Sequence, residues 1–393
     1  MAISTDKTKI KELLTRGVEE SIDAKNLQKR LESGKQLRVK LGIDPTSAHI
    51  HLGRSIPLLK LRDFQELGHQ IVFIVGDATG VIGDTSDKES ERPMLTREDV
   101  ANNLKNYKEQ VGKILDLDKI EFRHNSEWLN KLSYDEIGEH ANVFSLAEFI
   151  SRDNIRKRLD AGTRVSLREV LYPLMQGYDS VSIKADVELG GTDQRFNLLA
   201  GRTLQAHFGQ EPQDILMNPL VAGTDGRKMS SSWGNTVNLT DEPNDMFGKI
   251  MSIPDDLIIT YFTCMTREPL ALVREYEAQL ASGTNPRDVK MLLGKAIVSF
   301  YHSVEASEIA EAQFINTFSK KQTPDDMPEL SPVSTNIVDV LIEAGFATSK
   351  GDARRAIDGG GVRINEDTVE SHDVEVKSGD VVNKGKRHFV RIL

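Results

Sequence analysis

Two short motifs combine basic and hydroxyl side chains in patterns that could bind phosphate groups. The first motif, His51-Leu52-Gly53-Arg54, lies where an expected strand gives way to an expected helix. A helix N-terminus offers free N–H groups and a positive dipole end, and a glycine allows close approach of the backbone. We therefore predict a phosphate site here, while a simple helix cap at His51 is an equally good interpretation of four residues.

The second motif, Lys228-Met229-Ser230-Ser231-Ser232, follows Asp225-Gly226-Arg227 and places two cations on a hydroxyl-rich loop. Such a loop is able to close over a polyphosphate. A solvated surface loop is the alternative for this motif alone. The two motifs in this order, with an α/β half of the chain between them, favour a nucleotide-binding site.

A third group of polar residues shares one face of an expected helix. Ser166 and Glu169 form a capping-box pattern, and Tyr172, Gln176 and Asp179 follow at positions i, i+4 and i+7. Such a face could hold a small polar ligand. In isolation, a solvated polar helix face is the commoner interpretation of this pattern.

Three segments that lead to glycine are the expected strands of a central sheet. Residues 37–41 alternate apolar and basic side chains, residues 71–75 are wholly apolar, and residues 185–189 lead into Gly190-Gly191-Thr192-Asp193. A strand, a glycine turn and a helix in this order are typical of nucleotide-binding α/β folds. We predict the α/β fold class, with a doubly wound, Rossmann-like parallel sheet.

Helical patterns surround these strands and divide the chain further. Residues 96–158 are mainly helical in pattern, the segment after residue 240 is helical again, and residues 320–332 form a polar, proline-bearing linker. We predict three domains: a catalytic domain with a helical insertion over 1–227, the signature loop with an α-helical domain over 228–331, and a small α+β unit over 333–393.

The composition limits the class of protein. The 393 residues are 38% hydrophobic and 28% charged, which is ordinary for a globular protein, and the formal net charge is -10. That charge argues against indiscriminate binding of nucleic acid, so any RNA contact must lie at a local basic cluster. Because the chain has a single cysteine, Cys264, and no signal-like or membrane-length apolar segment, we predict a cytoplasmic protein without a disulfide, a resident metal site or a membrane segment.

Basic side chains gather in two places. One cluster lies in the helical insertion and contains Arg152, Arg156, Lys157 and Arg158. The other lies in the C-terminal unit, around an expected helix that begins after Ser349, and contains Arg354, Arg355, Arg363, Lys384, Lys386, Arg387 and Arg391. Both clusters are candidate RNA contacts, and a solvated basic helix is the alternative for the second.

Taken together, the two phosphate-binding motifs resemble the signatures of class I aminoacyl-tRNA synthetases, which usually read His-Ile-Gly-His and Lys-Met-Ser-Lys-Ser. Further segments are similar, in the same order, to those of tyrosyl-tRNA synthetases, and the similarity runs almost from end to end. These segments are Gly42–Thr46, Gly76–Asp84, Tyr172–Asp179 and Gly190–Gln194. The C-terminal unit, especially Ser349–Arg355, resembles an S4-type RNA-binding domain.

This resemblance implies an enzyme that activates L-tyrosine with ATP and Mg²⁺ to tyrosyl-adenylate and pyrophosphate, and then transfers tyrosine to the 3′ end of tRNA(Tyr). It also implies a homodimer that pairs through residues 96–149. The alternatives are a tryptophanyl-tRNA synthetase, a related adenylyltransferase without an RNA partner, and a non-catalytic RNA-binding protein derived from a synthetase. Asp179 and the S4-like tail favour tyrosine over tryptophan.

The resemblance also implies roles for individual residues. Tyrosine would contact Lys40, Thr79, Asp84, Tyr172, Gln176, Asp179 and Gln194, with the phenol donating to Asp179. ATP would contact Asp44, Thr46, His51, Gly53, Gly190, Gly191, Asp193, Lys228 and Met229. The charge that develops on the phosphates would be stabilised by His51, Arg54, Lys228, Lys88 and Arg92. Transfer RNA would contact Arg156, Lys157, Arg158, Lys350, Arg354 and Arg355.

Three residues depart from the family pattern. Arg54 replaces the last histidine of the first signature, where a fixed guanidinium suits an anionic phosphate at least as well. Ser231 replaces the second lysine of the other signature, so we expect Lys228 and Arg227 to meet more of the phosphate charge. Lys40 stands where many tyrosyl-tRNA synthetases carry a tyrosine that contacts the phenol, and its ammonium would donate to the same oxygen if it turned inward.

Overall fold

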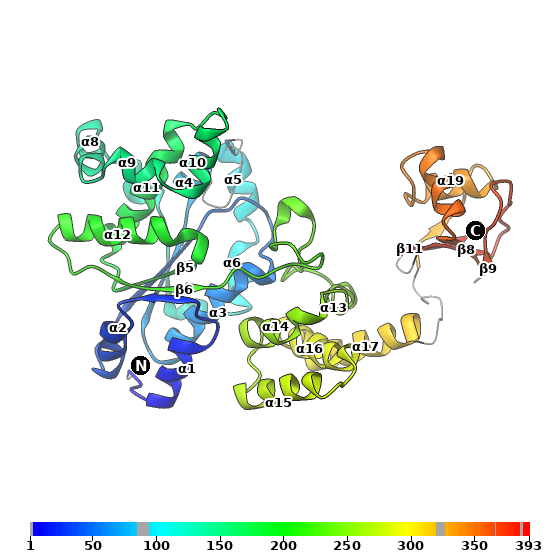
Figure 1. Ribbon diagram of the computed structural model, residues 1–393, viewed down its shortest axis with the longest axis horizontal. Coiled ribbons are helices and arrows are strands. Elements are labelled where there is room, and N and C mark those ends of the chain that lie inside the picture. Colours follow the sequence, from blue (N-terminus) through cyan, green and yellow to red (C-terminus); the bar gives the residue numbers. More distant parts are fainter. Residues whose placement is uncertain (1–2, 85–93, 320–326, 366, 386–387) are drawn as a thin grey trace. The chain divides into compact units, whose positions relative to one another are not determined.

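The computed structural model describes residues 3–84, 94–319, 327–365, 367–385 and 388–393. The chain divides into two compact units, Met1–Ser303 and Val304–Leu393 (Figure 1). Within the described ranges, no helix is both long enough and apolar enough to cross a membrane.

Among the described residues, the first unit is built on a six-stranded sheet in the order β1-β6-β5-β2-β3-β4. The parallel strands are β2 (Arg38–Ile43), β3 (Gln70–Val75), β4 (Ile120–His124), β5 (Val187–Gly191) and β6 (Asp214–Asn218), and β1 (Glu20–Ile22) pairs antiparallel with β6. The register places Leu41 opposite Phe73. Residues 71–75 are all buried, as expected of a parallel strand covered on both faces. The predicted parallel sheet is confirmed.

The strand order changes direction between β2 and β5. From β2 the chain crosses through α3 (Leu52–Glu66) to β3 on one side, whereas β5 and β6 lie on the other side of β2. At such a switch point a crevice forms outside the carboxyl ends of the strands. The segments that follow β2, β3 and β5 are therefore placed to line a ligand site.

The helices α11 (Leu167–Ile183) and α12 (Arg195–His207) pack closely against each other. Gly177 permits this approach, because a Cβ there would lie 3.0 Å from Leu204 Cδ1. The polar face of α11 that the sequence predicted is thus carried by a firmly packed helix.

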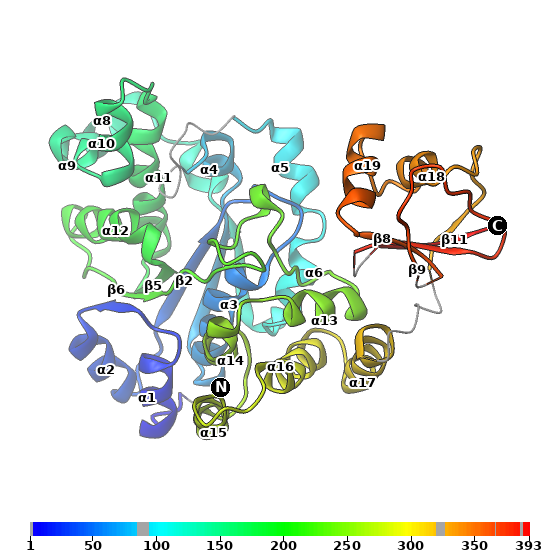
Figure 2. The ribbon, with the colours of Figure 1, turned by 45° about the vertical axis from the view of Figure 1, so that its right-hand side comes forward.

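Smaller helices complete the first unit, and Figure 2 shows α8, α9 and α10 grouped beside α11 and α12. Before α11 they are α1 (Lys7–Thr15), α2 (Ala24–Glu32), α4 (Asp77–Ile82), α5 (Arg97–Leu104), α6 (Tyr107–Gly112), α7 (Ser126–Leu129), α8 (Tyr134–Asn142), α9 (Leu146–Ile150) and α10 (Asp153–Asp160). After β6 the chain is helical, as predicted, with α13 (Pro243–Met251), α14 (Ile258–Met265), α15 (Leu270–Ala281) and α16 (Pro286–Tyr301).

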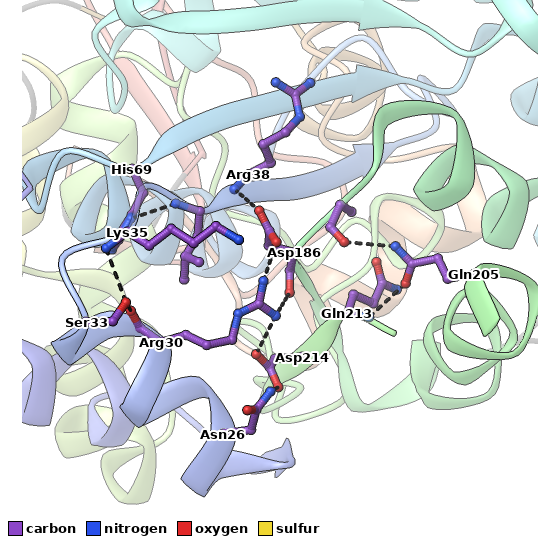
Figure 3. A network of polar contacts seen from close by, with 12 residues as sticks. Asn26, Arg30, Ser33, Lys35, Arg38, His69, Asp186, Gln205, Gln213 and Asp214 are labelled. Carbon is purple, nitrogen blue, oxygen red and sulfur yellow. Dashed lines mark hydrogen bonds and ion pairs between the residues drawn. The ribbon is translucent and has the colours of Figure 1, made fainter. Parts of the chain in front are cut away.

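A polar network closes the amino ends of the strands (Figure 3). Arg30 of α2 forms ion pairs with Asp186 and with Asp214, the latter at 3.1 Å. Asp186 also accepts the backbone N–H of Arg38 at 2.8 Å, and Asn26 donates to Asp214 at 3.0 Å. These contacts join α2 to the starts of β2, β5 and β6, so this end of the sheet is held by structural ion pairs.

The described part of the second unit begins with α17 (Val304–Phe314), which continues as a π-helical turn over Ile315–Ser319. A five-stranded sheet follows in the order β7-β11-β10-β8-β9. Its strands are β7 (Glu329–Leu330), β8 (Val362–Ile364), β9 (Asp367–Thr368), β10 (Val381–Lys384) and β11 (His388–Ile392). The helices α18 (Ile337–Glu343) and α19 (Lys350–Asp358) share a core with this sheet that includes Val340, Ile357 and Val382. The predicted α+β fold of this unit is confirmed.

Candidate active site

A cavity of about 470 Å³ opens at the carboxyl ends of the strands in the first unit. From the predicted tyrosine and ATP sites it is lined by Asp44, Thr46, His51, Gly53, Arg54, Thr79, Asp84, Tyr172, Gln176, Asp179, Gly190, Gly191, Asp193, Gln194, Lys228 and Met229. Two other predicted residues, Lys88 and Arg92, lie outside the described residues. In the parts of the chain that the structure describes, no three His, Cys, Asp or Glu side chains are gathered so that they could hold a metal ion.

The two phosphate-binding motifs lie together because backbone hydrogen bonds join the segments around them. The Leu52 N–H donates to the Val237 carbonyl at 2.8 Å, and the Gly53 N–H lies 3.2 Å from the sulfur of Met229. A side chain at residue 53 would crowd this junction, because a Cβ there would lie 3.1 Å from Nδ1 of His51. The glycine of the first motif therefore gives room to His51 of the same motif, while Met229 of the second motif lies at an ordinary contact distance of 3.5 Å.

His51 caps α3 and also lines the cavity. Its Nδ1 accepts the N–H of Arg54 at 3.3 Å. Burial, together with the positive charges of Arg54 and Lys228, lowers the pKa of His51 to about 3. The imidazole is therefore neutral near pH 7, and since Nδ1 is an acceptor, Nε2 carries the proton and is the hydrogen-bond donor. The helix-cap and phosphate-site interpretations of His51 are thus compatible.

Arg54 supplies a fixed positive charge at the same end of the cavity. Its guanidinium donates to the hydroxyl of Thr46 at 2.8 Å and to that of Tyr107 at 3.3 Å. These two hydroxyls hold the planar group in one orientation without adding a negative charge. Such a group is well suited to contact a phosphate.

Lys228 also lines the cavity, and its ammonium pairs with the Asp193 carboxylate at 3.0 Å. Asp193 folds back over the end of β5, and Gly191 makes room for it, because a Cβ at residue 191 would lie 2.5 Å from Oδ1 of Asp193. The second motif therefore meets the glycine turn that follows β5, as a nucleotide site at the switch point requires.

The loop that carries Lys228 is organised by Asn235, a buried residue that sequence reasoning did not identify. Its Nδ2 donates to the carbonyl oxygens of Arg227 at 3.2 Å and Lys228 at 3.1 Å, and its Oδ1 accepts the N–H of Ser230 at 2.9 Å. An asparagine shortly after a serine-rich loop was the available signal, because this side chain readily bonds to nearby backbone.

Asp44 forms the centre of a buried cluster at the end of β2. Its carboxylate accepts hydrogen bonds from Thr79 Oγ1 at 2.7 Å and from Tyr172 Oη at 2.8 Å. Burial raises the pKa of Asp44 to about 6, against the lowering effect of these two hydrogen bonds. Gly76 is necessary here, because a Cβ at that position would lie 2.0 Å from Oδ1 of Asp44.

Asp179 is buried further along α11. Oδ1 accepts the indole N–H of Trp128 at 2.7 Å, and Oδ2 lies 3.4 Å from the Asn125 amide nitrogen. Burial raises the pKa of Asp179 to about 7. Sequence reasoning missed Asn125 and Trp128 because it treated residues 96–158 as helical and so missed β4, the strand after which both residues lie.

Two glutamines complete the polar lining between these carboxylates. Gln194 donates to Asp84 at 2.7 Å and accepts from Asn197 at 3.0 Å. Gln176 donates to Glu188 at 3.3 Å. The lining thus combines several carboxylates with neutral amides, a composition suited to a small ligand that carries a cationic group.

Lys40 does not line the cavity, so the predicted direct contact between its ammonium and the phenol is corrected. The side chain is fully buried, and Nζ lies 2.8 Å from Glu188, 2.8 Å from the Ser180 hydroxyl and 2.9 Å from the Gln176 carbonyl. Burying an ammonium without a negative partner costs free energy. The partner of Lys40 is Glu188, which, like Lys40, does not line the cavity.

Arg158 is also corrected as a tRNA contact. Its guanidinium is buried, lies 2.6 Å from the Glu169 carboxylate and donates to the Arg164 carbonyl at 2.6 Å. Glu169 in turn accepts the Ser166 N–H at 2.9 Å, in the predicted capping box. Arg158 therefore stabilises the start of α11, and although it borders the groove described next, its charge is already met by Glu169.

The other predicted tRNA-binding residues are exposed. Arg156 and Lys157 lie on α10, and Lys350, Arg354 and Arg355 lie on α19. Lys157 also lines a second groove of the first unit, together with Arg152, Arg195 and Asp193. Because Asp193 lines both this groove and the cavity, the groove is adjacent to the candidate active site.

Comparison with known proteins adds independent evidence. A family model described as tRNA synthetases class I (W and Y) matches residues 32–319, and one described as Tyrosine--tRNA ligase SYY-like C-terminal domain matches residues 319–392. The tyrosine–tRNA ligase of Thermotoga maritima is 46% identical over 386 residues, which cover 97% of this chain and 96% of the relative. That of Carboxydothermus hydrogenoformans is 44% identical over 399 residues, covering 97% of both.

Solved structures show a similar fold. Tyrosyl-tRNA synthetase from Archaeoglobus fulgidus, solved with L-tyrosine, superposes with a TM-score of 0.62 at 24% identity, covering 78% of this chain and 100% of the other. Tryptophanyl-tRNA synthetase from Plasmodium falciparum gives a TM-score of 0.59 at 14% identity, covering 79% and 90%. At these identities the similarity concerns the fold alone.

Proposed function

The chain belongs to the tyrosine–tRNA ligases, a family of class I aminoacyl-tRNA synthetases, and we propose that the cavity of its first unit is where tyrosine is activated with ATP. The observation that carries this proposal is that residues of both signatures and the polar face of α11 line one cavity. The full-length relatives at 44 to 46% identity favour tyrosine over tryptophan and over an adenylyltransferase without RNA.

Tyrosine lies along α11 in this proposal. Its phenol donates to Asp179, whose carboxylate is held by Trp128. Its ammonium lies among Tyr172, Gln176, Thr79 and Asp84. The carboxylate of Asp84 supplies negative charge for the ammonium. Gln194 faces the carboxylate of tyrosine, which is the reacting group.

ATP lies across the carboxyl ends of β2 and β5, along Asp44, Thr46, Gly53, Gly190, Gly191, Asp193 and Met229, with Mg²⁺ carried on its phosphates. The tyrosine carboxylate attacks the α-phosphorus, the bond from that phosphorus to the β-phosphate bridging oxygen breaks, and pyrophosphate leaves. His51 donates through Nε2, and Arg54 and Lys228 contribute positive charge as the phosphates become more anionic. Lys88 and Arg92, outside the described residues, belong to the same proposal.

In the second step a hydroxyl of the terminal ribose of tRNA(Tyr) attacks the tyrosyl carbonyl carbon, and AMP leaves. Arg156 and Lys157 contact the acceptor arm beside the groove that adjoins the cavity. The α-helical region within 228–331 contacts the anticodon arm, and the S4-like unit over 333–393 contacts tRNA through Lys350, Arg354 and Arg355. Exposed positive charge on α10 and α19 supports these contacts.

The protein is proposed to act as a homodimer in the cytoplasm. Large apolar side chains are exposed on helices α8 to α11, including Tyr134 at 93% and Leu167 at 78% of their full accessible area. The others are Ile137, Leu146, Ile150, Leu159 and Leu171. Apolar groups of this size at one region of a surface are typical of a protein interface.

Pyrophosphate exchange tests the activity directly. The protein is incubated with ATP, labelled pyrophosphate and each of the twenty amino acids in turn. Exchange that depends on tyrosine, and only weakly on phenylalanine or tryptophan, is the expected result. Absence of exchange with every amino acid would overturn the proposed activity, and exchange that depends best on tryptophan would overturn the choice of substrate.

A further inference from the structure

A buried ion pair lies directly beneath the part of the cavity that we assign to tyrosine. Lys40 and Glu188 are exposed to 0% and 1%, and the ammonium lies 2.8 Å from the carboxylate. A pair this deeply buried loses hydration on both sides, so it adds little net stability compared with apolar residues of the same size. Its presence calls for an explanation other than stability.

The ion pair connects three elements of the sheet layer. Lys40 comes from β2 and Glu188 from β5, and both bond to α11. Lys40 donates to the Ser180 hydroxyl at 2.8 Å and to the Gln176 carbonyl at 2.9 Å. Glu188 accepts from the Ser180 hydroxyl at 3.0 Å and from the Gln176 amide at 3.3 Å.

Glu188 is also held from its far side. Gln213 donates to the same carboxylate, and it is completely buried. Gly201 of α12 provides the space, since a Cβ there would lie 2.6 Å from Nε2 of Gln213 and 3.3 Å from Oε2 of Glu188. The carboxylate of Glu188 is therefore held by Lys40, by α11 and by Gln213.

We propose that Lys40 and Glu188 are positioning residues for tyrosine: the pair fixes the turn of α11 that carries Gln176 and Asp179, and its two charges act on the carboxylate that receives the phenol. This inference rests on the proposed function, because it requires the phenol at Asp179. It assigns a role to Glu188, and it gives Lys40 an indirect role in place of the predicted contact with the phenol.

The electrostatic part follows from the groups that face Asp179. Burial raises its pKa to about 7, the positive charge of Lys40 lowers it, and the negative charge of Glu188 raises it. The other titratable group nearby is Tyr172, also on α11, whose pKa is raised well above its usual value, chiefly by burial. The carboxylate form of Asp179 is the stronger acceptor for a phenol, so its ionisation controls tyrosine affinity.

The two charges must then act on tyrosine binding in opposite directions. Lys40→Met removes the positive charge, which raises the pKa of Asp179 and weakens tyrosine binding near pH 7. Glu188→Gln removes the negative charge, which lowers that pKa and extends tight binding to lower pH. A purely structural role would weaken binding in both variants without moving its pH dependence.

The experiment measures the dissociation constant of tyrosine by titration calorimetry between about pH 5.5 and 8.5, on the full chain. We expect the pH midpoint of tyrosine binding to move up in Lys40→Met, with affinity at pH 7 lower by about fivefold for a rise of one unit in a pKa that begins near 7. In Glu188→Gln we expect the pH midpoint of tyrosine binding to move to lower pH. A second step near pH 6 from Asp44 should stay in place, because its pKa is set chiefly by burial and by its hydrogen bonds to Thr79 and Tyr172.

Lys60→Met is the matched control, because it removes another buried ammonium, which contacts Asp63 and the Leu13 carbonyl rather than the cavity. Its midpoint should equal that of the parent. If Lys40→Met fails to fold, the double variant Lys40→Met/Glu188→Gln replaces it, and its midpoint should lie above that of Glu188→Gln.

Midpoints that stay fixed, or that move in the same direction in both variants, would overturn the inference. Failure of the proposed function would look different, because the unchanged protein would then show no tyrosine-dependent pyrophosphate exchange.

Discussion

The ammonium of Lys228 lies 3.0 Å from the carboxylate of Asp193, so the loop of the second signature is held by charge at the glycine turn that follows β5. The two residues approach the cavity from different segments, and both line it. In the proposed reaction Asp193 lies along the nucleotide. The ion pair therefore holds the ammonium of Lys228 near the phosphates of ATP.

Lys228→Ala should lower kcat for pyrophosphate exchange by about 10²- to 10³-fold and change the dissociation constant of tyrosine little. The charge acts on phosphates that become more anionic in the transition state, and it does not touch tyrosine. Lys249→Ala is the matched control, because this lysine is also 29% exposed and paired with an aspartate, Asp241. Equal losses in kcat and tyrosine binding would contradict the role given to Lys228.

Arg54→His should retain most of the exchange activity, whereas Arg54→Ala should lose about 10- to 100-fold in kcat/KM for ATP. Histidine restores a donor at this position, while alanine leaves the hydroxyls of Thr46 and Tyr107 without their common partner. Arg62→Ala, on the same helix and paired with Glu66 at 2.8 Å, is the control and should keep normal exchange. If the two Arg54 variants were equally active, Arg54 would not contact a phosphate.

Leu146→Asp together with Ile150→Asp should shift the protein from dimer to monomer, because both changes place a charge among the exposed apolar side chains of α9. Sedimentation equilibrium at micromolar concentration should give twice 43.8 kDa for the parent and 43.8 kDa for the variant. Leu292→Asp changes an exposed leucine of α16 and should leave the dimer intact. A parent protein that sediments only at 43.8 kDa would exclude the dimer.

The sequence predicted three strands of the first sheet, β2, β3 and β5, because their signals are local. Residues 37–41 and 71–75 are apolar segments that end at glycine, and the two signatures are short and adjacent to them. The polar face of one helix, together with the family resemblance, predicted that Asp179 lies in the cavity. Each of these features is formed by residues that are close together in the chain, so the pattern can be recognised in the sequence.

The partners of buried charges could not be predicted in the same way. Lys40 and Arg158 were both assigned to ligands, but each charge is met by a glutamate, Glu188 on β5 or Glu169 on α11. A basic residue looks the same in a sequence whether it faces solvent, a ligand or a buried carboxylate. The strand β4 alternates apolar and charged side chains over residues 120–123, but it is short and lies between helical patterns, so the helical interpretation was extended across it.

Deleting residues 332–393 should leave tyrosine-dependent exchange nearly unchanged and strongly reduce charging of tRNA(Tyr). The helices and strands removed share a core of their own, and every described residue of the cavity lies in the first unit. A sharper version is the double variant Arg354→Gln/Arg355→Gln, which should weaken tRNA binding and lower its salt dependence by about one to two phosphate contacts. Lys377→Gln, an exposed lysine of the same unit, is the control. Normal charging by the deletion variant would refute an RNA role for this unit.

Asp179→Asn should stabilise the folded protein at alkaline pH and weaken its preference for tyrosine. In the folded protein the pKa of Asp179 is raised from its usual value to about 7, so its contribution to stability is present below about pH 4 and is lost as the pH rises through 7. Above pH 7 the ionised carboxylate costs the fold a free energy on the order of a few kcal/mol, which the neutral amide avoids. Thermal unfolding of the variant should therefore occur at higher temperature than that of the parent at pH 8, and this advantage should shrink as the pH falls and disappear below about pH 4.

The same change should narrow the preference for tyrosine over phenylalanine in pyrophosphate exchange, mainly by losing tyrosine. The phenol then meets a neutral amide in place of a charged acceptor, while the indole N–H of Trp128 keeps an oxygen partner at residue 179. An unmet buried polar group costs about 1 to 3 kcal/mol, so we expect kcat/KM for tyrosine to fall by about 10- to 100-fold. Phenylalanine has no hydroxyl to lose, so its much lower kcat/KM should stay constant or rise. If Asp179→Asn kept the full preference for tyrosine, the phenol would have to lie elsewhere in the cavity, and the pH dependence assigned to Lys40 and Glu188 would lose its basis.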